Sequence, residues 1–137
     1  MIQRLIHRLL LLPMGLRRKI CGVYLLLLAF LSLVPAYFFP PPVTRIPGID
    51  TWMHVAMYGG LGVLLRWAAG PDPLPSAARW LPLGAAGYGL LMEVLQLLFS
   101  GGNRMFGWDD AAANLAGAFL FWALAGWIIN SHPVQKS

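Results

Sequence analysis

Charged residues are scarce in this chain. Asp, Glu, Lys and Arg make up 11% of its 137 residues, whereas hydrophobic residues make up 58%. Soluble domains carry roughly 25% charged residues, and a domain of this size keeps much of its surface in contact with solvent. The composition therefore nearly excludes a water-soluble globule. It also excludes intrinsic disorder, which needs low hydrophobicity and many charges, so the expected solvent is lipid.

Cysteine is almost absent as well. The single cysteine, Cys21, has no partner for an internal disulfide, and there is no Cys pair for a structural zinc site. We expect Cys21 to be an apolar core residue. The net charge of +5 could suggest nucleic-acid binding, but five of the ten basic residues lie in the first 19 positions, directly before a long apolar run. That arrangement is typical of a membrane anchor with a positive flank, so no nucleic-acid partner is expected.

Four apolar stretches are long enough to cross a bilayer. The first has no charged residue over 20 positions, and at 1.5 Å per residue it spans a hydrocarbon core of about 30 Å. The stretches run over approximately 20–39, 52–69, 80–99 and 111–129. We therefore expect an all-α fold: a polytopic membrane protein with a four-transmembrane-helix bundle in one domain, residues 20–130, and a cytoplasmic tail at 131–137.

The first 19 residues form a basic N-terminal segment. One helical face of residues 1–12 is apolar and the cations lie off that face, which predicts an interfacial amphipathic helix on the inner leaflet. With both termini in the cytoplasm, eight of the ten Lys and Arg residues fall on the cytoplasmic side, and only Arg45 and Arg104 fall outside. The positive-inside rule favours this orientation.

This topology brings polar residues from three predicted helices to the outer face. The second helix starts there, the third ends there and the fourth starts there. Their polar residues recur at helical spacings and so share one face of each helix. With one arginine from the outer loop, the predicted binding residues are Asp50, His54, Tyr58, Glu93, Gln96, Arg104, Asp110 and Asn114.

Glu93 is the most informative of these residues. It lies six positions before Phe99, and a lone carboxylate inside the bilayer costs about 2.5–3.5 kcal/mol even on lenient scales. It must face the bundle interior and find a partner, for which His54 and Arg104 are available, or else be protonated. We expect His54, Glu93 and Asn114 to meet in the outer half of the bundle, with Arg104 or Asp110 folding over them. The alternative is a polar network that only fixes helix packing.

Three segments carry a resemblance to a known family. They are Asp50-Thr51-Trp52-Met53-His54, Glu93-Val94-Leu95-Gln96, and Arg104 followed by Asp110-Ala111-Ala112-Ala113-Asn114 and Gly117. The ordered set, over roughly residues 20–130, resembles the VanZ-like membrane proteins, whose pattern is Asp-Lys-x-x-His, Glu-x-x-Gln, Arg, Asp-x-x-x-Asn and x-x-Gly. Thr51 stands where the family usually has Lys, and Phe121 stands where a second glycine often follows.

The resemblance implies a multi-pass protein of the bacterial inner (cytoplasmic) membrane that acts in the cell envelope. The family is named for a member linked to low-level resistance to the glycopeptide antibiotic teicoplanin. It therefore implies an envelope context, with antibiotic resistance as one possible outcome, rather than a particular reaction.

We expect the outer polar residues to bind or handle an envelope lipid or an amphipathic antibiotic. Arg104, with its forked donors, could hold a phosphate-bearing head group, although the neighbouring acids repel a phosphate unless a metal intervenes. Two other classes stay open: a membrane-embedded enzyme acting on a lipid head group, and a structural or assembly protein. For the enzyme, the catalytic candidates are His54, Glu93 and Asp110.

No cofactor or metal is expected from the sequence. The chain has no nucleophile elbow, phosphate loop or paired-His motif. His54 with Asp50, Glu93 and Asp110 could bind a divalent ion, but one His among several acids is a common chance grouping. The six tryptophans and 15 glycines permit a dimer without requiring one.

Overall fold

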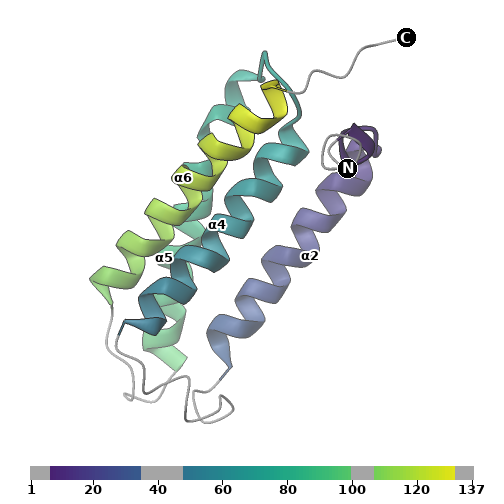
Figure 1. Cartoon of the computed structure of the whole chain (residues 1–137). Helices are drawn as coiled ribbons and strands as arrows, with labels where there is room; N and C mark the ends of the chain where they lie inside the picture. Colours follow the sequence, from purple (N-terminus) through teal and green to yellow (C-terminus); the bar gives the residue numbers. More distant parts are fainter. Residues whose placement is uncertain (1–6, 35–47, 100–106, 132–137) are drawn as a thin grey trace.

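The computed structural model describes residues 7–34, 48–99 and 107–131. Of these described residues 89% are helical and none lies in a strand, which confirms the all-α class. The long elements are α2 (Met14–Leu33), α4 (Ile49–Ala69), α5 (Leu81–Phe99), which continues the 3-10 helix η2 (Ser76–Trp80), and α6 (Trp108–Ser131). Figure 1 shows these helices side by side in one bundle, with successive long helices running in opposite directions.

The helices begin earlier than the apolar stretches predicted. α2 starts at Met14, directly after Pro13, and not at Ile20; proline is tolerated at a helix start because the first N–H groups have no intrahelical partner. α4 and α6 each gain a polar first turn, which contains Asp50 in α4 and Asp109 in α6. Acidic side chains stabilise a helix N-terminus, so the helices continue where the hydropathy has already fallen.

The predicted N-terminal amphipathic helix is described only in part. Residues 7–10 are helical, a turn follows, and Pro13 then separates them from α2. Residues 1–6 and the end of the predicted first span, 35–39, lie outside the described residues. The basic residues Arg17, Arg18 and Lys19 belong to the first turns of α2.

Two of the described helical stretches are long and apolar enough to cross a membrane, Ser76–Phe99 and Trp108–Ser131. The other two long helices carry more polar residues, with three cations at the start of α2 and both His54 and Arg66 inside α4. The helices thus establish an all-α bundle in which two helices suit a bilayer. Four spans remain a prediction.

Close packing of α4 against α6 depends on glycine. A Cβ on Gly117 of α6 would lie 2.5 Å from the backbone oxygen of Val55, and a Cβ on Gly62 of α4 would collide with the backbone oxygen of Ala118. Only glycine allows backbones to approach this closely. The contact sets His54, which precedes Val55, close to the first turns of α6.

The α2 helix is tied to the rest of the bundle through backbone carbonyls. Tyr24 donates a hydrogen bond from its hydroxyl to Met57 O at 2.9 Å, and Tyr88 donates one to Leu25 O at 2.7 Å. The core beneath these contacts consists of buried residues from all four helices, Leu28, Tyr58, Leu61, Ala85 and Ala118.

Candidate functional site

His54 is the centre of a polar cluster at one end of the bundle. It lies about one turn into α4, and its side chain is only 12% exposed. Polar side chains approach it from its own helix, from the end of α5 and from the start of α6. The histidine cluster, as we call it below, comprises Asp50, His54, Glu93, Asp110 and Asn114.

One ring nitrogen of His54 faces the bundle interior. Nδ1 lies 2.9 Å from Asn114 Oδ1 and 3.7 Å from Glu93 Oε1. Both partners are buried, with Asn114 1% and Glu93 4% exposed. Because an amide oxygen only accepts, the contact with Asn114 requires Nδ1 to carry the hydrogen and donate it. The neutral imidazole therefore has its lone pair on Nε2.

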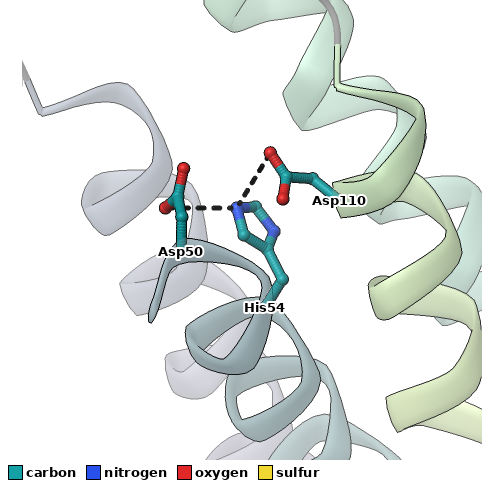
Figure 2. Close-up of side chains that lie close together, drawn as sticks. All are labelled: Asp50, His54 and Asp110. Carbon is teal, nitrogen blue, oxygen red and sulfur yellow. Dashed lines mark ion pairs between the residues drawn. The ribbon is translucent and has the colours of Figure 1, made fainter. Parts of the chain in front are cut away.

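The other ring nitrogen faces two carboxylates. Nε2 lies 4.0 Å from Asp50 Oδ1 and 3.9 Å from Asp110 Oδ2, distances too long for hydrogen bonds. Figure 2 shows the two carboxylates on either side of this nitrogen, Asp50 from α4 and Asp110 from α6. The side chain of Asp50 is 65% exposed and that of Asp110 is 21% exposed, so this side of the cluster is open to the surroundings.

The start of α6 explains how Asp110 reaches His54. α6 begins at Trp108, and Asp110 is its third residue. A carboxylate in the first turn meets the positive end of the helix dipole. A Cβ on Gly107 would lie 2.6 Å from Asp110 Oδ2, so the absence of a side chain at Gly107 leaves room for this carboxylate.

The predicted convergence is confirmed for five of the eight predicted binding residues, Asp50, His54, Glu93, Asp110 and Asn114. Gln96 is not part of the cluster: its side-chain Nε2 donates a hydrogen bond to Ser32 O of α2 at 2.7 Å. Tyr58 is buried in the core one turn below His54, and its hydroxyl has no hydrogen-bond partner. Arg104 lies outside the described residues.

Asn114 has a second polar atom that matters for the site. Its Nδ2 is buried and has no hydrogen-bond partner. The side chain fits because residue 89 is a glycine: a Cβ on Gly89 would lie 2.7 Å from Nδ2. The sequence alone did not single out Gly89 or Gly107. The position of Gly89, one helical turn before Glu93, was the feature of the sequence that could have identified it.

A separate polar network closes the opposite end of the bundle. Arg66 is buried, pairs with Asp72 at 3.3 Å, donates to Gly70 O and lies over the ring of Trp122 at 5.7 Å. Asn130 donates to Asp72 in turn. These contacts join the end of α4 to the end of α6. The sequence did not identify them, because Asp72 lies within a Gly- and Pro-rich break.

The two ends of the bundle differ in charge. Every Lys and Arg in the described ranges belongs to the end opposite the histidine cluster, namely Arg8, Arg17, Arg18, Lys19, Arg66 and Arg79. The histidine cluster has Asp109 as a further acidic neighbour in the first turn of α6. In the part of the chain that is described, the cluster end is therefore acidic and would attract a cation.

An apolar cavity of about 450 Å³ lies between the start of α2 and the region where α4 ends and α5 begins. Its lining includes Arg18, Leu25, Leu65 and Leu81. Cys21 also lines it and is buried as predicted, with its thiol 3.2 Å from Leu64 O. The cavity is remote from the histidine cluster, at the basic end.

Comparison with known proteins gives no match: no protein-family model, no curated protein and no solved structure matches this chain.

Proposed function

We propose that this chain is an integral protein of the bacterial inner membrane, with four membrane-spanning helices and both termini in the cytoplasm. We further propose that its histidine cluster binds or handles the head group of an envelope lipid or of an amphipathic antibiotic at the outer face. The observation that carries the proposal is the placement of His54. Its imidazole is nearly buried, yet acidic and amide groups surround it at the end of the bundle opposite the Lys and Arg residues that the structure describes.

The surface of the bundle supports a membrane location. Large apolar side chains are exposed on all four long helices, for example Val23 and Phe30 on α2, Val63 on α4, Leu98 on α5 and Leu120 on α6. Soluble monomers rarely expose apolar surface continuously around a bundle. Against lipid tails the same side chains carry no penalty.

The exposed tryptophans support a specific depth of the histidine cluster in the membrane. Trp52 and Trp108 lie at the cluster end, and Trp80 and Trp127 lie towards the opposite end. Tryptophan is enriched at both membrane–water interfaces. Trp108 and Trp127 are separated by 19 residues on α6, or about 28 Å along the helix axis, close to the thickness of a bilayer core. His54 follows Trp52 by two residues, so the histidine cluster would lie at head-group depth.

The charge difference between the ends supports the orientation. The basic end would face the cytoplasm by the positive-inside rule, which puts the acidic end and its histidine cluster outside. The polar network of Arg66, Asp72 and Asn130 would then lie at the inner interface, where a charged group costs less than at the bilayer centre.

A relationship to the VanZ-like family is part of the same proposal. The resemblance rests on short segments far apart in the sequence, and His54, Glu93, Asp110 and Asn114 from these segments lie in mutual reach around one imidazole. Gly117, the last residue of the pattern, lies where α6 touches α4. If this chain and the VanZ-like proteins share this site, we expect both to act in the cell envelope.

Lipid that copurifies with the protein tests the proposed function. The full chain is extracted in mild detergent, and its bound lipids are identified by mass spectrometry beside a total membrane extract. We expect one class of phosphorylated lipid to be enriched with the wild-type protein and lost from His54→Ala. The control is Asp109→Asn, an exposed acid beside the cluster, which should retain the lipid.

The other outcomes of this experiment separate the alternatives. A lipid profile equal to that of the total membrane in all variants contradicts the proposal. Conversion of the enriched lipid to a product by the wild-type protein alone indicates the membrane-embedded enzyme. Loss of folded His54→Ala protein without any lipid enrichment in the wild type indicates a structural role.

A further inference from the structure

We propose that Asp50, His54 and Asp110 form a binding site for a divalent transition-metal ion, with Zn²⁺ the best fit. Each residue offers one ligand atom, and the ligand atoms lie within 4.8 Å of one another. The geometry of these three side chains supports ion binding independently of any lipid or antibiotic ligand. The sequence had not favoured a metal, because it could not show that two acids from different helices face the same ring nitrogen.

The imidazole is oriented as in established metal sites. A histidine that binds a metal through one nitrogen almost always donates the other N–H to a carbonyl or carboxylate, which fixes the tautomer. Here Nδ1 donates to Asn114 Oδ1 at 2.9 Å, with Glu93 Oε1 at 3.7 Å on the same side. Nε2 is left with its lone pair, and no described residue lies within hydrogen-bond distance of it.

The distances at Nε2 suit a shared ion better than direct contact. The carboxylate oxygens at 3.9 and 4.0 Å are beyond hydrogen-bond range. Zinc ligands lie about 2.0–2.2 Å from the metal, which puts two ligands of a tetrahedral site about 3.4 Å apart. The two carboxylate oxygens lie within 4.8 Å of each other, so closing the site around an ion needs side-chain movements of roughly 0.5–1.4 Å. Asp50, which is largely exposed, is free to make them.

The charge balance favours occupancy. Two carboxylates and a neutral imidazole together offset the charge of one divalent ion, so the loaded site is close to neutral. Without an ion, the carboxylates of Asp50 and Asp110 face the same nitrogen, with their oxygens within 4.8 Å of each other. Because like charges near a membrane interface repel strongly, a bound cation relieves that repulsion.

The ligand types decide which ion fits. An imidazole nitrogen suits zinc and other transition metals, whereas Mg²⁺ and Ca²⁺ prefer sites made of oxygen alone. Three protein ligands leave a fourth position open, as in zinc sites that take an exogenous ligand. If the proposed function holds, on which this last step rests, an anionic head group would fill that fourth position, and the acids would no longer repel a phosphate.

Zinc binding to the purified full chain in detergent, without added lipid, tests the inference. After chelator treatment, Zn²⁺ is titrated by isothermal calorimetry. We expect saturable binding of one ion per chain, weakened about tenfold or more in His54→Gln and in Asp110→Asn. The matched control is Asp109→Asn, which removes the same charge from the neighbouring position and should leave the affinity unchanged.

The variant Asp50→Asn distinguishes the loss of a metal ligand from misfolding as the cause of lost Zn²⁺ binding. Asp50 is mostly exposed, so this variant should keep the wild-type melting temperature and still lose Zn²⁺ affinity. Absence of saturable binding to the wild type, an equal loss in Asp109→Asn, or tighter binding of Mg²⁺ than of Zn²⁺ would each overturn the inference. Zinc binding without any lipid enrichment would leave the metal site in place and reject only the proposed function.

Discussion

The imidazole of His54 on α4 donates to the side-chain oxygen of Asn114 on α6 across 2.9 Å, between residues 60 positions apart in the chain. Because Asn114 is buried, water cannot replace this bond. It fixes the ring plane of His54 and the nitrogen that faces outward. The role of Nε2 in the histidine cluster depends on this contact.

Asn114→Ala should therefore impair ligand binding more than it impairs folding. The substitution removes the acceptor for Nδ1, and the ring can then turn or change tautomer. We expect Zn²⁺ affinity to fall by about tenfold to a hundredfold, measured by calorimetry on protein that still forms a helical bundle. Asn130→Ala, at the opposite end of α6, is the control. It should lower the melting temperature by breaking the contact with Asp72 and leave Zn²⁺ affinity intact, whereas equal losses in both variants would contradict the role of Asn114.

Glu93→Gln separates a functional role from a packing role. Glutamine keeps the shape of Glu93 but removes the charge 3.7 Å from His54 Nδ1. We expect the variant to accumulate in the membrane, because glutamine keeps the hydrogen-bonding capacity of the side chain and an uncharged group costs less to bury. The same protein should retain less copurified lipid than the wild type. Failure to accumulate would assign Glu93 to packing, and wild-type lipid retention would remove it from the site.

Gly117→Ala tests the contact that brings α4 and α6 together. The new Cβ would meet the backbone oxygen of Val55 at 2.5 Å, and a backbone cannot yield as a flexible side chain can. We expect a loss of about 1–3 kcal/mol of stability, the usual cost of overpacking, together with weaker Zn²⁺ binding. Gly84→Ala is the matched control, since nothing lies within 4 Å of its Cβ position. It should be neutral or stabilising by up to about 1 kcal/mol in the same denaturation assay.

Much of the histidine cluster could be predicted from the sequence, because helical spacing and topology act together. Asp50 and His54 share a face at i, i+4, and Asp110 and Asn114 share another. Because α4 and α6 begin at the same end of the bundle and run parallel, the two faces meet at one level. The confirmed meeting of His54, Glu93 and Asn114 follows from that reasoning.

The direction of Gln96 could not be predicted in the same way. It shares a helical face with Glu93, but its bond to Ser32 O depends on where α2 packs. The sequence analysis assigned no inward face to α2, so it could not show which α2 carbonyl Gln96 would reach. The early start of α2 was also missed, since hydropathy marks the apolar part of a helix and not its hydrogen-bonded ends. The tautomer of His54 needed a distance that no sequence contains.

Accessibility of single cysteines in right-side-out membrane vesicles tests the central claim most directly, because ligand binding from outside requires the histidine cluster to face outward. In a Cys21→Ala background, Asp50→Cys and Ser76→Cys each place one thiol at an exposed position, at opposite ends of the bundle. A membrane-impermeant maleimide should label Asp50→Cys in sealed vesicles and Ser76→Cys only after permeabilisation. Labelling of Ser76→Cys but not Asp50→Cys in sealed vesicles would contradict the account.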